Sequence, residues 1–315
     1  MGSSATFGCD VSTRGRLRLT GEDRARFLNG QVTNDVKNLA PGTGCYAAFA
    51  NGKGKMRADA VILNHDDSLL LDLEAGYDAS IAVELDKFII ADDVLVEGLT
   101  EVWRAFAIVG ARAGDVLRDM NLCDAPPARL FDIASNGAGS SFVFRSRRSI
   151  TDSFDVWVQL ADHEALSKRL RSALEKAGGG ISDISELEIS RIEAGIPRFG
   201  VEMDEGTLPP EAGIESVAIS YTKGCYLGQE VIARIKSVGH VNRTLARLQL
   251  PDAAQRKEPL LSNGKEVGRL GSAVTSPRFG RIGLAIIRRE AASPGTRLAL
   301  PQGEAVVVAD FTSPR

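Results

Sequence analysis

At 315 residues, with 43% hydrophobic and 25% charged residues, the chain has the composition of a soluble globular protein of more than one domain. A formal net charge of −3 provides no general attraction for phosphate backbones, so direct nucleic-acid binding is not expected. The sequence contains no run of 18 apolar residues and no signal-peptide pattern. We therefore expect a cytoplasmic protein without a membrane partner.

The predicted elements of the first part mix helices and strands irregularly. Thr20 is predicted to cap a short helix that contains Phe27 and Leu28, with Asp23 in its third position and Gly30 at its end. Apolar runs predict strands at 59–63, 69–73, 102–109, 142–145 and 156–160. Helices are expected at 80–88, 114–120 and 164–177. Without regular strand and helix alternation, an α+β fold is favoured.

The second part of the chain changes character. Residues 200–216 are rich in glycine, proline and acids and predict a long ordered loop. From about Asn242 onward, short strands separated by turns predict a small β-barrel or sandwich, with a hairpin at Asn263 and Gly264. The glycine and lysine cluster at 52–55 does not fit a phosphate-binding loop, and we interpret it as a turn.

The four cysteines are Cys9, Cys45, Cys123 and Cys225, far apart and without a CxxC motif. They predict reduced thiols and no metal site made by neighbouring residues. Ligands that are distant in sequence, or supplied by two subunits, stay open.

The octapeptide KGCYLGQE at 223–230 is the most distinctive stretch. Cys225 lies between two glycines, with Lys223 upstream, and a nearby ammonium favours a thiolate. Gly224 and Gly228 are predicted to use backbone conformations that other residues avoid. The alternative is an ordinary turn leading into a strand or helix at 231–235.

Two carboxylates occupy positions where they need a partner. Glu193 shares a predicted helical face with Ile189, Ile192 and Ile196, so it should meet a ligand donor or pair with Arg191 or Arg198. Asp59 precedes a run of strand-forming residues, where it either lines a cavity or is solvated at a strand end.

The octapeptide resembles the signature of the YgfZ family, folate-binding relatives of the glycine-cleavage T protein. Segments 17–36, 51–63, 191–203, 239–245 and 268–277 also resemble it. The resemblance implies two intertwined α+β lobes and a C-terminal β-barrel around a central folate cavity. The implied lobes are 1–50 with 181–238, which carries the signature, and 51–180, followed by the barrel at 239–315.

The resemblance also implies roles for particular residues. Glu193 would hold the pterin ring, and Asp59 would contact folate nitrogens and is a candidate catalytic residue. The aminomethyltransferases carry two consecutive aspartates where this chain has Ala58 and Asp59. They also carry an arginine where Gln229 stands, so a folate would meet the Gln229 amide, and its tail would need Lys223 or Arg234. Cys225 is a nucleophile, a redox-responsive thiol or a transient iron ligand.

The expected function is that of an accessory protein that binds tetrahydrofolate or a one-carbon derivative. It would support iron–sulfur cluster assembly or repair, with iron–sulfur client or assembly proteins as partners and an indirect effect on tRNA modification. Two alternatives stay open, a folate-dependent aminomethyl or methyl transferase and a non-catalytic scaffold. The residues leave open whether a reaction is catalysed.

Overall fold

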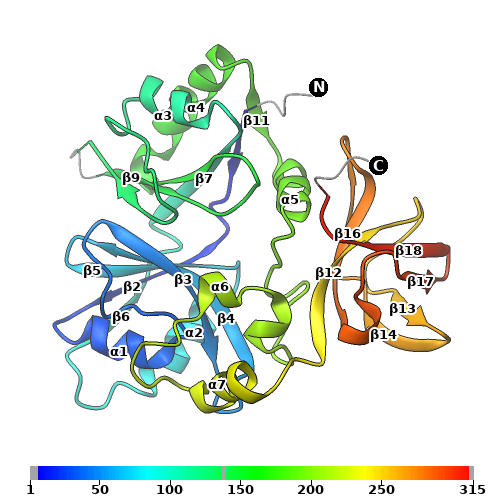
Figure 1. The fold of residues 1–315 in the computed structure, drawn as a ribbon. Coiled ribbons are helices and arrows are strands. Elements are labelled where there is room, and N and C mark those ends of the chain that lie inside the picture. The colour runs from blue at the N-terminus through cyan, green and yellow to red at the C-terminus, as the bar shows by residue number, and fades with distance from the viewer. Residues whose placement is uncertain (1–5, 137–139, 312–315) are drawn as a thin grey trace. The chain divides into compact units, whose positions relative to one another are not determined.

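Residues 6–136 and 140–311 are described by the computed structural model, whose elements are drawn in Figure 1. The chain forms two compact units, and the path of the backbone passes between them several times. The first unit comprises the described residues up to Phe49, Ala58–Leu187 and Val217–Tyr226. The second comprises Ala50–Arg57, Glu188–Ser216 and the described residues from Leu227 onward.

A six-stranded sheet and two helices form one half of the first unit. Apolar residues of the strands and of the helices α3 (Ala113–Asp119) and α4 (His163–Lys176) share a core that includes Phe106, Leu117 and Leu170. The strand order is β11 (Gly180–Ser182), β1 (Phe7–Asp10), β7 (Trp103–Val109), β10 (Ser153–Gln159), β9 (Ser141–Arg145) and β8 (Ile133–Ala134). The strands and helices predicted between residues 102 and 177 are confirmed within a few residues.

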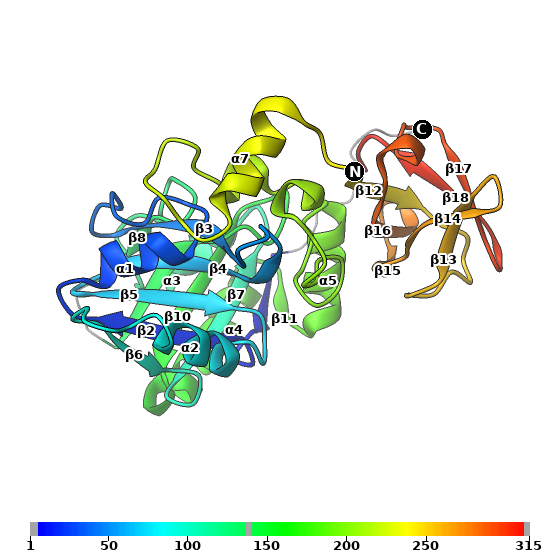
Figure 2. The ribbon, with the colours of Figure 1, turned by 90° about the horizontal axis from the view of Figure 1, so that it is seen from below.

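The other half of the first unit is built on a five-stranded sheet. Its order is β3 (Thr43–Ala50), β4 (Met56–His65), β5 (Ser68–Leu73), β2 (Gly15–Thr20) and β6 (Leu95–Gly98). Helices α1 (Arg24–Gln31) and α2 (Asp78–Asp86) cover this sheet (Figure 2) and bury Leu28 and Ile81 in its core. A further apolar cluster joins the two sheets through residues such as Leu63 and Trp157.

The first helix begins and ends later than predicted. Thr20 is the last residue of β2, where it pairs with Leu95, so it does not cap a helix. Gly21, with φ of 100°, turns the chain, and Asp23 stands directly before the helix. The helix continues through Gly30 to Gln31. Strand pairing, which is decided by distant residues, overrides the local capping pattern here.

Helix α5 (Ile184–Glu193) is divided between the two units, because the first unit ends at Leu187 and the second continues from Glu188. The segment 200–216 is ordered as predicted and carries the 3₁₀ helix η2 (Pro209–Ala212) and the start of α6 (Glu215–Ala218). Residues 231–235 lie in helix α7 (Gln229–Val238), so the helical alternative is the observed one. Two further 3₁₀ turns are η1 (Leu160–Asp162), in the first unit, and η3 (Arg289–Ala291).

The C-terminal strands close into a barrel, as predicted. The strands are β12 (Arg243–Gln249), β13 (Pro259–Ser262), β14 (Lys265–Arg269), β15 (Ser272–Ser276), β16 (Gly280–Arg288), β17 (Arg297–Leu300) and β18 (Gly303–Val308). Pairing of β12 with β16 closes a ring, to which β15 adds an extra strand. Asn263 and Gly264 both have positive φ angles, 50° and 75°, and form the predicted tight hairpin turn.

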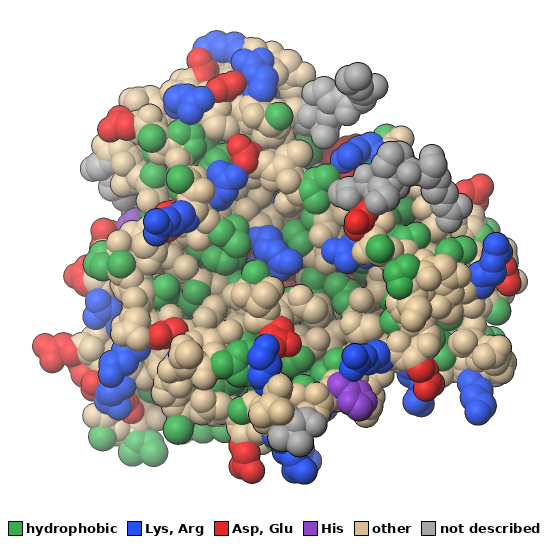
Figure 3. Space-filling model, viewed as in Figure 1, with side chains coloured by type: hydrophobic (Ala, Val, Ile, Leu, Met, Phe, Trp, Pro, Cys, Tyr) green, Lys and Arg blue, Asp and Glu red, His purple; other side chains and the backbone are tan. Residues whose placement is uncertain are grey.

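The fold is therefore α+β with a C-terminal β-barrel, as the sequence predicted. The two compact units group the residues differently from the two lobes and barrel predicted above, whose boundaries stay a prediction. Acidic and basic side chains are interspersed on the face shown in Figure 3, without a large patch of one charge. Among the described residues, no helix combines the length and the apolarity needed to cross a membrane.

Candidate functional site

Asp59 lies inside strand β4 and is buried, with 8% of its surface exposed. The alternative of a solvated strand-end aspartate is therefore wrong. The Tyr46 hydroxyl, from β3, donates a hydrogen bond to Asp59 Oδ2. Because Ala60 pairs with Leu73 in the β4–β5 ladder, Glu74 follows at the position next to Asp59.

These surroundings change the acidity of the Asp59 carboxyl. Burial, followed by the negative charge of Glu74, raises the pKa of Asp59 to about 7, although the Tyr46 hydrogen bond and the Arg14 charge act in the opposite direction. Burial and the Asp59 charge raise the pKa of Tyr46 well above its usual value. An acid with a pKa near neutrality is able both to donate and to accept a proton at physiological pH.

Sequence reasoning missed Tyr46, Glu74 and Arg14. Arg14 donates from Nη1 to Glu74 Oε1 at 2.5 Å and from Nε to Asp72 Oδ2 at 2.8 Å, which holds Glu74 in place. The only sequence signal was the strand pairing of 59–63 with 69–73, which would have placed Glu74 opposite Asp59.

The signature turn is anchored by its first and fourth residues. Lys223 Nζ donates to three backbone carbonyls, those of Asn29 at 2.6 Å, Val32 at 2.7 Å and Asn34 at 2.6 Å. The ammonium also lies 5.0 Å from the centre of the Tyr226 ring. Lys223 and Tyr226 are both buried, whereas Cys225 between them is exposed. The turn therefore presents a thiol from a fixed backbone.

The geometry of Lys223 does not fit the predicted role of binding a folate tail. An ammonium has three donor protons, and three carbonyls accept from it. Burial lowers the pKa of Lys223 to about 8, with the charges of Asp35 and Cys45 opposing the shift. We assign Lys223 to holding the turn that carries Cys225. The sequence around Lys223 contains no pattern that tells whether this side chain points into the protein or out to solvent.

Only one of the two signature glycines needs its special conformation. Gly228 has φ of 82°, and a Cβ added there would lie 2.4 Å from the Asn51 carbonyl oxygen. Gly224 has no positive φ, and a Cβ there would meet nothing within 4 Å. The prediction is confirmed for Gly228 and wrong for Gly224. The close approach packs the start of α7 against the turn at 51–54.

In the second unit, Glu193 ends helix α5 and its side chain is 10% exposed. Ser276 Oγ donates to Glu193 Oε1 at 2.5 Å, while Arg278 Nη1 lies 3.5 Å from Oε2. The Ser276 hydroxyl is itself fixed by the backbone NH groups of Arg278 and Phe279. Among the described residues, the long Arg278 contact is the one contact of Oε2, so this oxygen is able to accept from a further donor.

The predicted structural partners of Glu193 were wrong. Arg191 donates to Glu188 and Glu202, and Arg198 donates to Glu188. These arginines tie the end of the helix to the following loop, because Arg191 also donates to the Ile196 carbonyl. The remaining predicted residues lie on α7 of the same unit, where Gln229 is half-buried and Arg234 is exposed.

Over the described parts of the chain, no group of three or more His, Cys, Asp and Glu side chains is arranged to hold a metal ion. All four cysteines are free thiols, and Cys225 is the exposed one.

Both parts of the fold match models of a single protein class. Residues 4–223 match the GCVT N-terminal domain, and residues 243–314 match the glycine cleavage T-protein C-terminal barrel domain. The chain therefore belongs to the glycine-cleavage T-protein family.

Several relatives share most of the length of the chain. A chloroplastic protein of Arabidopsis thaliana that is named as a transferase is 28% identical over 96% of this chain and 69% of its own. The aminomethyltransferase of Bacillus subtilis is 25% identical over 91% of this chain and 81% of its own. The crystal structure of the glycine cleavage system aminomethyltransferase T from Bartonella henselae superposes with a TM-score of 0.87. At 19% identity, covering 98% of this chain and 87% of that one, it supports the fold.

Proposed function

We propose that this protein binds tetrahydrofolate or a one-carbon derivative of it and supports iron–sulfur cluster assembly or repair, as a member of the YgfZ branch of its family. The observation that carries the proposal is the signature turn. Lys223 and Tyr226 are buried as anchors, and Cys225 is exposed between them. Such a turn makes a thiol available to a partner without moving the backbone. The effect on tRNA modification would then follow from iron–sulfur modifying enzymes.

Folate binding is supported by family membership and by two buried carboxylates. A reduced pterin presents an amino group and ring NH groups, which suit a carboxylate acceptor such as Glu193 Oε2, where the Arg278 contact is long. Asp59 stays a proposed folate contact. Gln229 and Arg234 stay proposed contacts for the rest of the folate. Lys223 is not included, because its three donors are already engaged.

Titration calorimetry with tetrahydrofolate tests the folate proposal. We expect micromolar binding, about 8 kcal/mol, which is lost in Glu193→Ala because the carboxylate acceptor is removed. Glu186→Ala, at an exposed position of the same helix, is the control and should bind as the wild type does. Circular dichroism checks that each variant is folded. A wild-type protein that is folded and does not bind would contradict the folate proposal and favour the scaffold alternative.

Complementation tests the role of the thiol. In a cell that lacks its own copy, Cys225→Ala should restore less iron–sulfur enzyme activity than the wild type, because the exposed nucleophile is gone. The neighbouring exposed residue Thr222 supplies the control, and Thr222→Ala should complement fully. Full complementation by Cys225→Ala would remove the thiol from the mechanism.

A second candidate function is favoured by Asp59. A carboxyl with a pKa of about 7 suits proton transfer during a folate-dependent aminomethyl or methyl transfer. Ala58 stands where the transferases have a further aspartate, so Asp59 would act without that neighbour. Incubation of the protein with tetrahydrofolate and an aminomethylated lipoyl carrier protein tests this function. Release of ammonia and formation of methylene-tetrahydrofolate would support it, and no turnover would count against it.

A further inference from the structure

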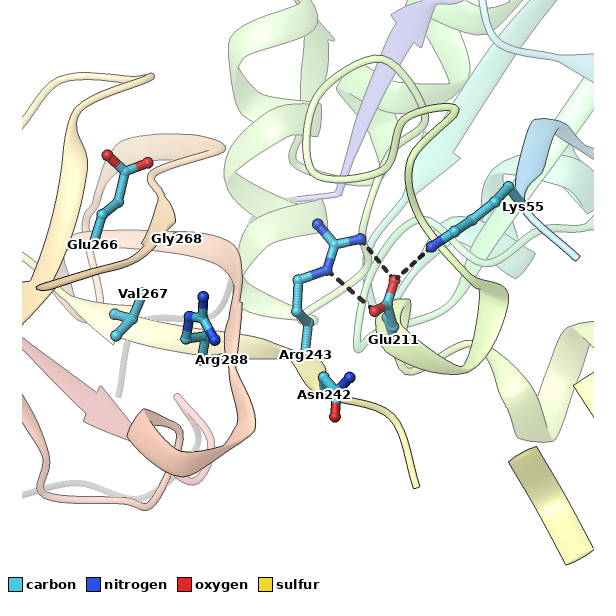
Figure 4. Close-up of a pocket in the computed structure, with 8 residues that line it drawn as sticks. All are labelled: Lys55, Glu211, Asn242, Arg243, Glu266, Val267, Gly268 and Arg288. Atoms are coloured by element: carbon cyan, nitrogen blue, oxygen red, sulfur yellow. Dashed lines mark hydrogen bonds and ion pairs between the residues drawn. The ribbon is translucent and has the colours of Figure 1, made fainter. Parts of the chain in front are cut away.

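A pocket of about 470 Å³ lies within the second unit, and its lining includes none of the residues used in the proposed function (Figure 4). This volume is in the range of pockets that hold small molecules. Its lining combines the turn before β4, the 3₁₀ helix η2 and the barrel. The lining residues are Lys55, Glu211, Asn242, Arg243, Glu266, Val267, Gly268 and Arg288.

One wall of the pocket is a fixed ionic cluster. Glu211 is buried, and both of its oxygens accept from Arg243, at 3.1 Å from Nε and 2.8 Å from Nη2. Lys55 Nζ lies 3.9 Å from Glu211 and donates to the Gly206 carbonyl at 2.7 Å. The negative charge of Glu211 is therefore already balanced by two cations.

The adjoining wall carries a second guanidinium. Arg243 of β12 and Arg288 of β16 are directly opposite each other in the antiparallel ladder, so both side chains lie on the same face. Figure 4 shows Arg288 between Val267 and Arg243. Like charges in such a pair repel each other. Across residues 6–136 and 140–311, no hydrogen bond or ion pair engages the Arg288 side chain or Arg243 Nη1.

The positive charges of the pocket lining are not fully balanced by its two carboxylates, Glu211 and Glu266. Glu266, the other carboxylate, is exposed and pairs with Arg269 at 2.9 Å. The uncompensated donors are thus those of Arg288 and the free nitrogen of Arg243. Next to them, Gly268 contributes no side chain, and an added Cβ would lie 2.6 Å from the Ile286 carbonyl oxygen.

We propose that this pocket binds a small organic anion, whose carboxylate or phosphate group lies between Arg243 and Arg288. Planar guanidinium groups donate paired hydrogen bonds to both kinds of anion, and the anion removes the repulsion between the two arginines. The body of the ligand contacts Val267 and the backbone at Gly268, with the Asn242 amide at the rim. The lining includes none of the proposed folate contacts.

Calorimetric titration of the full chain in low-salt buffer tests the site, with inorganic phosphate and citrate as the two probes. Binding of citrate alone identifies a carboxylate site, and binding of phosphate alone identifies a phosphate site. Arg288→Gln should weaken the binding of the preferred probe about tenfold or more. Arg297→Gln, at an exposed barrel arginine paired with Glu304, is the matched control and should change it less than about twofold.

Two further measurements keep the test decisive. Arg288→Gln removes the repulsion, so its melting temperature without ligand should not fall, and Arg288→Lys should retain weaker anion binding. Tetrahydrofolate affinity, if present, should be unchanged in Arg288→Gln, and a parallel loss would overturn the assignment of a separate site. Absence of binding by both probes to the wild type, or equal binding to Arg288→Gln, would overturn the proposal.

Discussion

A carboxylic acid with a pKa near 7 changes its protonation state in the pH range where cells operate. Asp59 has this property because it is buried in strand β4 with the charge of Glu74 nearby. The hydrogen bond from the Tyr46 hydroxyl stabilises the charged form of Asp59, but it offsets only part of the rise in pKa. Lys223 and Cys225 also have very different surroundings, although they are only two positions apart. The Lys223 side chain is buried among backbone carbonyls, whereas the Cys225 side chain is exposed.

The raised pKa of Asp59 predicts a pH-dependent stability. Between about pH 4 and pH 7 the folded protein retains a proton that the unfolded chain releases, so stability falls as the pH rises through this range. Above about pH 7 Asp59 is ionised in the folded protein as well, so the folded state bears the full free-energy cost of the buried charge. Asp59→Asn lacks the titration, and its free energy of unfolding relative to the wild type should therefore be higher at pH 8 than at pH 5.

Urea denaturation of both proteins at pH 5, 6, 7 and 8 measures this difference, which should reach a few kcal/mol. Asp67→Asn, at an exposed turn, is the control and should show no such trend. A difference between Asp59→Asn and the wild type that is the same at every pH would show that Asp59 titrates normally.

At the scale of elements, the second unit brings two glycine-containing segments into contact. The turn at 51–54 precedes β4, and Gly228 precedes α7, yet the backbone of one lies against the backbone of the other. Gly228, in the left-handed conformation, is the residue directly before the first helical residue, Gln229.

Gly228→Ala should therefore destabilise the protein. Its φ of 82° is strained for alanine, and the added Cβ would lie 2.4 Å from the Asn51 carbonyl oxygen. We expect a loss of about 1–3 kcal/mol in the free energy of unfolding. The matched control is Gly224→Ala in the same signature, which should be near neutral because its Cβ would meet open space. Equal effects of the two changes, measured by thermal unfolding, would contradict this account.

At the scale of the molecule, a buried ionic network joins the two sheets of the first unit. Asp72 of β5, 1% exposed, accepts from Arg14 at 2.8 Å and lies 3.6 Å from Arg148. Arg148 also donates from Nε and Nη2 to the two carboxylate oxygens of Asp155 in β10. The two sheets are therefore joined both by these ion pairs and by the apolar cluster between them.

Asp72→Asn should cost about 3–5 kcal/mol, because it removes a buried charge that two half-buried arginines share. Chemical denaturation measures the loss. Asp67→Asn removes an exposed aspartate from the neighbouring turn and should change stability by less than about 0.5 kcal/mol. A similarly small effect of Asp72→Asn would show that Arg14 and Arg148 are held by their other partners.

Part of the candidate site followed from sequence patterns, and part did not. The signature identified Cys225 and its exposed turn, and the apolar face of α5 identified Glu193 as a carboxylate in need of a partner. The actual partner, Ser276, is more than 80 positions away and comes from a barrel strand. The sequence predicted Arg191 and Arg198 as partners of Glu193, because a sequence pattern reveals only residues that are close along the chain.

The sequence by itself determined the α+β class, the helix predicted at 164–177, the closely spaced barrel strands and the hairpin at Asn263 and Gly264, because periodicity and turn chemistry are local properties. Only the tertiary structure decided that Lys223 points inward, that Asp59 meets Tyr46 and Glu74, and that Arg243 faces Arg288. Burial and charge pairing depend on residues far apart in the chain. The acidity and availability of a side chain therefore follow from the fold, even where its identity is plain in the sequence.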